Sequence, residues 1–263
     1  MTRLGYTESS DSHQPAILFL HGFMGSGADW AETISALDER YYCVAPDLPG
    51  QGCSLGLPPE DYTIEGATRT LLDLLDGLEI SRAALVGYSM GGRLALYLAL
   101  RGPERCSGLF LESASPGIED AAERQARREA DEQKARRLES GDFETFLANW
   151  YRQPLFASLA RHEGLVEALT AARSHNDPGE LARSLRGMGT GNQPSLWGGL
   201  GELEVPTLAV VGSLDERYVR IASLMATLNP RLRTAVVPGV GHHVRLEAPG
   251  VYLALLQGLL ESL

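Results

Sequence analysis

Residues 87–91 have the sequence GYSMG, which matches the pattern G-x-S-x-G. An apolar run at residues 83–86 precedes this pentapeptide, and a segment with apolar side chains at helical spacing follows it at residues 91–100. Glycines at both ends leave room for a tight turn from strand to helix, which strains the serine backbone and exposes its hydroxyl. The pentapeptide alone is a weak signal, but this strand-turn-helix context makes Ser89 a strong candidate for a nucleophile or a base.

A glycine-rich loop after an earlier apolar run supplies a second part of the candidate site. Residues 21–25, with the sequence HGFMG, follow the run at residues 16–20. Negative charge that develops on a substrate oxygen is stabilised by backbone N–H groups, one from the residue after the serine and one from the loop after an early strand. These positions predict Met90 and Phe23 as the oxyanion-hole donors. An ordinary glycine-rich turn is the alternative, and the chain order of the two loops argues against it.

A carboxylate and an imidazole are expected after the serine, in the chain order Ser, Asp, His. Asp215 and His242 each come shortly after a short apolar run, so both are expected at the carboxyl ends of late strands. His243 is the alternative base, but the Gly-His step after a Pro-Gly loop favours His242. We therefore predict a catalytic triad of Ser89, Asp215 and His242.

Short apolar runs alternate with helical patterns along most of the chain, which is typical of a mainly parallel sheet with helices on both faces. We expect strands at residues 16–20, 42–45, 83–86, 108–111, 207–211 and 234–237, and core helices at residues 64–78, 91–100 and 251–260. The alternation stops between residues 116 and 201, where helices are expected at residues 121–138, 143–150 and 163–173. The sequence therefore predicts an α/β core from residues 1–115 and 202–263, with an inserted helical cap at residues 116–201 over the strand ends where ligands bind.

Composition restricts the partners and the location. The 263 residues carry a formal net charge of −11, which argues against nucleic acid or an anionic membrane as a partner. The three cysteines form no C-x-x-C pattern, and no apolar stretch has the length of a signal peptide core or a membrane span. We expect a soluble cytoplasmic protein; the oligomeric state is left open.

No motif for a metal or a cofactor stands out. The sequence has no H-E-x-x-H, and the adjacent histidines at 242 and 243 are expected to point in different directions. The glycine-rich stretch GMGTG at residues 187–191 has no strand before it and no lysine after it, so we interpret it as a loop of the cap. We expect neither a metal nor an organic cofactor.

These features together resemble the α/β-hydrolase superfamily along nearly the whole chain, with DLPGQG at residues 47–52 as a further matching segment. Three segments are similar to the family of 2-succinyl-6-hydroxy-2,4-cyclohexadiene-1-carboxylate synthases. They are GYSMGGR at residues 87–93, NWYRQPLFASL at residues 149–159, and RS at residues 173–174 followed by Asn176. This resemblance implies a lyase of menaquinone biosynthesis, which eliminates pyruvate from 2-succinyl-5-enolpyruvyl-6-hydroxy-3-cyclohexene-1-carboxylate.

The same resemblance implies a set of substrate-binding residues and a small polycarboxylate as the substrate. Arginines of the helix after the serine and of the cap bind substrate carboxylates in that family; they correspond here to Arg93, Arg127 and Arg173, while Tyr88 and Trp150 line the pocket. The planar guanidinium fork suits a carboxylate. The alternatives are a solvated arginine-rich helix with pairs such as Glu123 to Arg127, and a Trp150 that only packs the cap.

We expect a mechanism in which His242, oriented by Asp215, makes Ser89 basic enough to take a ring proton α to a conjugated carbonyl. The oxyanion hole then stabilises the enolate-like charge, and pyruvate leaves. The alternative function is a serine hydrolase of carboxylated esters or C–C bonds that uses the same triad covalently. A catalytically inactive binding protein is disfavoured because every triad position is occupied.

Overall fold

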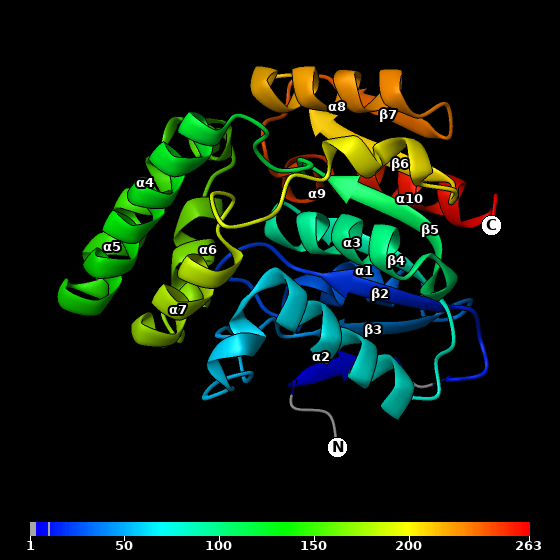
Figure 1. Ribbon diagram of the computed structural model, residues 1–263, viewed down its shortest axis with the longest axis horizontal. Helices are drawn as coiled ribbons and strands as arrows, with labels where there is room; N and C mark the ends of the chain where they lie inside the picture. Colours follow the sequence, from blue (N-terminus) through cyan, green and yellow to red (C-terminus); the bar gives the residue numbers. More distant parts are fainter. Residues whose placement is uncertain (1–3, 10) are drawn as a thin grey trace.

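The structure, a computed structural model that describes residues 4–9 and 11–263, is built on a seven-stranded sheet (Figure 1). The strands are β1 (Tyr6–Glu8), β2 (Ala16–Leu20), β3 (Tyr42–Pro46), β4 (Ala83–Tyr88), β5 (Cys106–Glu112), β6 (Thr207–Gly212) and β7 (Leu232–Val237). They lie in the order β1-β3-β2-β4-β5-β6-β7, with β1 antiparallel to β3 and every other neighbouring pair parallel. The predicted α/β class with a mostly parallel sheet is confirmed. Strand β1 was not predicted, because its three residues are all exposed and form no apolar run.

Helices cover both faces of the sheet. On β2, Leu18 and Leu20 belong to one core, whereas Ile17 and Phe19 belong to the other, as the alternation of side chains along a strand requires. The first core also contains side chains of α2 (Ile64–Gly77), α3 (Met90–Arg101) and α8 (Glu216–Leu228). The second contains side chains from α9 (Val244–Glu247), α10 (Pro249–Leu260) and the neighbourhood of α1 (Ala31–Ser35). Because both faces are covered, the strands read as nearly continuous apolar runs.

The sheet reverses its direction of growth at β2, which lies between β3 and β4. In the parallel pairing of β2 with β4, Leu20 lies opposite Gly87. The loops that follow these two strands therefore emerge side by side at the carboxyl edge of the sheet, the position where open α/β sheets bind ligands.

Four helices, which we call the cap helices, lie between β5 and β6 in the chain. They are α4 (Ala121–Ser140), α5 (Phe143–Tyr151), α6 (Leu165–Arg173) and α7 (Pro178–Met188), and no residue from 113 to 206 is in a strand. Figure 1 shows them grouped beyond the end of the sheet toward which β5 points. Two small apolar clusters hold them, one of which includes Met24 from the loop after β2. The exact domain boundaries stay a prediction. Leu200, just before the predicted boundary at residue 201, packs in the first core, together with Leu18 and Leu20.

The interpretation of residues 187–191 as a loop is wrong for the first two of them, which form the end of α7. A Cβ atom on Gly187 would lie 2.1 Å from the carbonyl oxygen of Tyr62. Glycine therefore allows α7 to pack directly against the backbone of the short 3-10 helix Pro59–Tyr62. At its other end, α7 begins with Pro178 in its first turn, and the Asp177 side chain accepts a hydrogen bond from Glu180 N–H at 2.9 Å.

The three cysteines form no disulfide bond among the described residues. Cys43 and Cys106 are buried, Cys53 is exposed, and all three thiols are free. In the described part of the chain, no helix combines the length and the apolar character that a membrane span needs.

Replacing Gly187 with alanine is expected to lower the free energy of unfolding by about 1–3 kcal/mol, because the new methyl group overlaps a backbone carbonyl that must move. Gly258, inside α10, is the matched control, since no atom lies within 4 Å of the position of its Cβ. Gly258→Ala should raise the free energy of unfolding by about 0.5–1 kcal/mol through helix propensity alone. Urea unfolding followed by circular dichroism measures both. Changes of the same sign and size would show that the contact between α7 and Tyr62 does not constrain position 187.

Candidate active site

The turn between β4 and α3 holds Ser89 in a strained conformation. Ser89 has φ 49° and ψ −105°, a region that residues other than glycine rarely adopt. Its N–H donates to the carbonyl oxygen of Glu112 on the neighbouring strand at 2.8 Å. A Cβ atom on Gly91 would lie 2.1 Å from the carbonyl oxygen of Leu20, so glycine is required where α3 passes β2. The turn thereby fixes the serine hydroxyl at the carboxyl edge of the sheet.

The three residues predicted as a triad meet at this edge. His242 Nε2 lies 3.1 Å from Ser89 Oγ, and His242 Nδ1 lies 2.6 Å from Asp215 Oδ2. Asp215 follows β6 and caps α8, where its Oδ1 accepts a hydrogen bond from Tyr218 N–H at 3.4 Å. With Nδ1–H donating to Asp215, Nε2 is free to accept the serine proton, which is the arrangement of a serine-activating triad.

His243 lies beside the triad and outside hydrogen-bonding distance of Ser89. Its ring stacks on Tyr88 with the ring centroids 4.0 Å apart, and its Nδ1 lies 3.4 Å from Glu112 Oε1. Burial lowers the pKa of His243 well below the usual value for histidine. The geometry therefore favours His242 as the base and gives His243 the position of a support behind Tyr88.

The loop after β2 is held by a buried histidine. His21 Nε2 lies 2.9 Å from Leu48 N–H, so it must accept, and Nδ1 then carries the proton that it donates to the carbonyl oxygen of Gly22 at 2.8 Å. Burial lowers the pKa of His21 and so favours this neutral form. The N–H groups of Phe23 and Met90 donate no hydrogen bond to any other residue that the structure describes. Both predicted oxyanion-hole donors are thus available to a ligand.

A narrow cavity, which we call the catalytic cavity, lies between Tyr88, His243 and the loop after β2 on one side and the cap helices on the other; the three triad residues are next to it in the chain or the fold but do not line it. Its volume is about 20 Å³, room for little more than one water molecule. Four residues predicted from the sequence line it: Phe23, Tyr88, Trp150 and Arg173. The structure therefore brings these four together, whereas Arg93 and Arg127 lie elsewhere.

Arg173 is not a free cation. Its two terminal nitrogens donate to the two carboxylate oxygens of Asp29 at 2.6 and 2.7 Å, and both side chains are largely buried. Arg245 approaches the same loop and donates to the carbonyl oxygen of Asp29 at 2.6 Å. The Asp29 carboxylate compensates most of the Arg173 charge, so a substrate carboxylate at Arg173 has to share it.

Arg93, on α3, is a buried cation of a different kind. Its terminal nitrogens donate to Gln193 Oε1 at 2.7 Å and to the carbonyl oxygen of Met188 at 2.8 Å. No carboxylate of the described residues lies within 4.0 Å of its guanidinium, and burial lowers its pKa to about 10. A buried charge without an opposite charge is costly. A bound anion would therefore interact strongly with Arg93.

Arg127 faces its own helix. Its Nε donates to both carboxylate oxygens of Asp131, each at 2.9 Å. The pair of Glu123 with Arg127, which the sequence offered as an alternative, is wrong because Glu123 lies 3.4 Å from Arg217 on α8 instead. Arg93 and Arg127 influence each other electrostatically, together with Tyr218, which places them on the side of His242 where α8 lies.

Three residues of the site, Tyr218, Phe156 and Asp29, were not predicted from the sequence. The ring of Tyr218 lies 4.7 Å from that of His242, and the ring of Phe156 lies 6.0 Å from it. Phe156 belongs to the cap segment at residues 149–159 that carried the family resemblance, so a signal for it existed. Tyr218 and Asp29 belong to no motif, and only the fold brings them to the site.

A parallel sheet that carries Ser, Asp and His at the carboxyl ends of its strands, in that chain order, defines an enzyme of the α/β-hydrolase class. A family model described as "alpha/beta hydrolase fold" matches residues 15–249, and the chain belongs to this family.

Within the family the chain is similar over its full length to 2-succinyl-6-hydroxy-2,4-cyclohexadiene-1-carboxylate synthases. It is 33% identical to the one of Klebsiella pneumoniae (strain 342) over 100% of both chains. It is 32% identical to the one of Enterobacter sp. (strain 638), over 97% of this chain and 95% of the relative. The solved structure of MenH from S. aureus superposes with a TM-score of 0.92 at 33% identity, over 100% of this chain and 99% of that chain.

Glu112, the last residue of β5, is a second acidic group next to the triad. It is fully buried, its Oε1 accepts a hydrogen bond from Arg245 N–H at 2.9 Å, and its Oε2 has no hydrogen-bond partner among the described residues. Burial raises the pKa of Glu112 to about 7, although the Arg245 charge opposes this. Glu112 therefore keeps its proton to a higher pH in the folded protein than an ordinary glutamate does.

The raised pKa predicts a pH-dependent stability. Between pH 4.5, the ordinary value for the unfolded chain, and about 7, the folded protein retains a proton on Glu112 that the unfolded chain releases, so stability falls as the pH rises. Glu112→Gln should therefore gain stability relative to the wild type between pH 5 and pH 8, by up to about 3 kcal/mol. Urea unfolding at both pH values measures this, with the exposed Glu104→Gln as the control. A pH-independent difference between Glu112→Gln and the wild type would contradict it.

Proposed function

We propose that the protein is a lyase that eliminates pyruvate from 2-succinyl-5-enolpyruvyl-6-hydroxy-3-cyclohexene-1-carboxylate to give 2-succinyl-6-hydroxy-2,4-cyclohexadiene-1-carboxylate in menaquinone biosynthesis. The observation that carries the proposal is the complete triad geometry in a chain that aligns end to end with synthases named for this product. A buried Arg93 that lacks an acidic partner fits a substrate with several carboxylates. Three free thiols suit a reducing compartment, so we also propose a cytoplasmic location.

The reaction needs a base that removes a ring proton and donors that hold the charge left behind. His242 Nε2, 3.1 Å from Ser89 Oγ, accepts the serine proton, and Ser89 Oγ in turn takes the ring proton α to the conjugated carbonyl. Asp215 stabilises the imidazolium that forms. The N–H groups of Phe23 and Met90 stabilise the enolate-like oxygen. Cleavage of the C–O bond then releases enolpyruvate, which takes up a proton and becomes pyruvate.

The substrate carboxylates are assigned to the arginines by their surroundings. Arg93 contributes most to binding of a substrate carboxylate in this proposal, because its charge is buried and uncompensated by any carboxylate of the described residues. Arg173 and Arg127 contribute less, since Asp29 and Asp131 already neutralise them. Tyr88 and Trp150 contact the ring.

Loss of a triad side chain tests the chemistry. Ser89→Ala and His242→Ala should each lower kcat for pyruvate release by about 10³-fold or more, because the residues of a triad act as a unit. His243→Ala, which removes the ring behind Tyr88, should lose far less. A coupled assay with lactate dehydrogenase measures pyruvate. If His243→Ala were the inactive variant, the assignment of the base would fall.

Mass spectrometry of protein quenched during turnover separates the lyase from a serine hydrolase. The lyase should show no substrate-derived adduct on Ser89, whereas the hydrolase passes through a covalent intermediate. An adduct that forms and decays at the rate of turnover would overturn the proposed mechanism.

Arg93→Ala should reduce kcat/KM for the carboxylated substrate by about ten-fold to several hundred-fold, since a charge-assisted hydrogen bond contributes about 1.5–3 kcal/mol. Arg93→Lys keeps the charge without the fork and should recover only part of the loss. Turnover of the neutral ester p-nitrophenyl acetate, where detectable, serves as the control and should change little. Equal losses on both substrates would mean that Arg93 holds the fold and not a carboxylate.

A further inference from the structure

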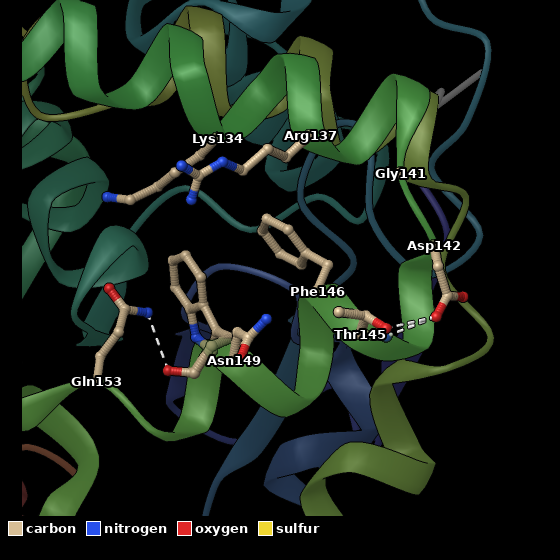
Figure 2. A pocket seen from close by; sticks show the side chains of 9 residues that line it. Lys134, Arg137, Gly141, Asp142, Thr145, Phe146, Asn149 and Gln153 are labelled. Atoms are coloured by element: carbon tan, nitrogen blue, oxygen red, sulfur yellow. Dashed lines mark hydrogen bonds between the residues drawn. The ribbon is translucent and has the colours of Figure 1, made fainter.

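A second cavity, larger than the catalytic one, lies between α4 and α5 (Figure 2). Its volume is about 300 Å³, which falls in the range of pockets for small organic ligands. Lys134 and Arg137 line it from α4, Phe146 and Trp150 from α5, with further contributions from Asn149 and Gln153. Figure 2 shows the Lys134 and Arg137 side chains extending into the space between the two helices, over Phe146. The mechanism derived above uses none of these residues except Trp150.

The cavity carries a surplus of positive charge in an acidic protein. Lys134 and Arg137 are one helical turn apart, and Arg137 forms no ion pair with any residue that the structure describes. Lys134 lies 3.6 Å from Asp131, but that carboxylate is already hydrogen-bonded to Arg127. The two like charges at this spacing repel each other unless an anion lies between them. Burial lowers the pKa of Lys134, and Arg127 and Arg137 lower it further against the opposing effect of Asp131.

The acid at the rim of the cavity has another role. Asp142 caps α5, where its carboxylate accepts hydrogen bonds from Thr145 Oγ1 at 2.6 Å and from Thr145 N–H at 3.1 Å. Its charge is directed to the N-terminus of α5, a favourable place for an anion. Asp142 therefore does not neutralise Lys134 or Arg137, and Asp131 is the carboxylate that approaches Lys134.

The rest of the wall is aromatic. Phe146 and Trp150 stack with their ring centroids 5.9 Å apart and an interplanar angle of 24°, and Lys134 Nζ lies 5.9 Å from the centroid of the Trp150 ring. A wall of this kind offers apolar contact to a planar or cyclic body. Together with two cations at the opposite wall, it selects a ligand with a ring and a carboxylate.

Trp150 lines both this cavity and the catalytic cavity. Its ring centroid lies 5.2 Å from that of Phe23, in the loop of the predicted oxyanion hole, and 6.1 Å from that of Phe156, which contacts His242. An occupant of the cavity between α4 and α5 therefore touches the same indole that walls the catalytic cavity.

We propose that the cavity between α4 and α5 is a second ligand site, which binds a cyclic or aromatic carboxylate with its carboxylate at Lys134 and Arg137 and its ring against Phe146 and Trp150. The site rests on this geometry and not on the proposed lyase activity. Compounds related to the proposed product and unrelated aromatic acids share the required chemistry, so the test includes one of each.

Isothermal titration calorimetry on the full chain tests the site with benzoate and with 2-succinylbenzoate, which has a ring, a carboxylate and a succinyl group like the proposed product. Lys134→Gln and Arg137→Gln should each weaken the binding of benzoate by about 5- to 20-fold, since each removes a charge-assisted contact. Arg136→Gln is the matched control: it removes the same charge from the same helix but does not line the cavity, so it should change binding less than two-fold. Benzamide, which lacks the charge, should bind more weakly than benzoate.

Arg93→Ala separates this site from the catalytic one. Benzoate binding that survives in Arg93→Ala and is lost in Lys134→Gln supports the second site, whether or not the protein releases pyruvate. In Arg93→Ala, tighter binding of 2-succinylbenzoate than of benzoate identifies a ligand related to the product, and equal binding of the two acids identifies a general aromatic acid. The proposal is overturned if neither acid binds at millimolar concentration, if benzamide binds as well as benzoate, if Arg136→Gln weakens binding as much as Arg137→Gln, or if only Arg93→Ala abolishes binding.

Discussion

The parallel pairing of β2 with β4 is the contact on which the site depends. Because Leu20 lies opposite Gly87, the loop after β2 and the turn at Ser89 leave the sheet next to each other. Gly91 completes this arrangement, since any side chain there would collide with the carbonyl oxygen of Leu20. A shift of this register by one residue would separate the hydroxyl from the N–H of Phe23 and exchange the faces of β2. The relative positions of the catalytic groups therefore depend first on the register of the sheet and only then on the individual side chains.

Burial of charge is the second constraint on this site. The protein is acidic overall, yet Arg93, Arg173 and Arg245 are buried close to the triad. Asp29 contacts two of them: its carboxylate forms an ion pair with Arg173, and its uncharged carbonyl oxygen accepts a hydrogen bond from Arg245. The guanidinium of Arg93, like that of Arg245, donates to neutral acceptors. Among the described residues, Arg173 is therefore the one of these three arginines with a carboxylate at ion-pair distance.

The sequence predicts the features that depend on local pattern and chain order. The mostly parallel sheet and its strands follow from apolar runs, and the meeting of Ser89, Asp215 and His242 follows from their common place at strand ends. Contacts between distant segments cannot be predicted in this way. The ion pair of Arg173 with Asp29 joins residues 144 positions apart, and no local pattern in the sequence indicates it. No helix was predicted over residues 178–188, and α7 was missed at its end for a related reason: Gly187 packs against the backbone of Tyr62 and does not form a turn.

Selectivity between reactions must come from the cap helices, because the core offers the same triad to a lyase and to a hydrolase. The catalytic cavity of about 20 Å³ is far smaller than a cyclohexene ring with three carboxylates, so in this conformation it does not hold a ligand of that size. Trp150 lines this cavity on one side and the larger cavity of about 300 Å³ on the other. The core therefore holds the reacting groups, and the cap helices form the opposite wall of the adjacent cavity.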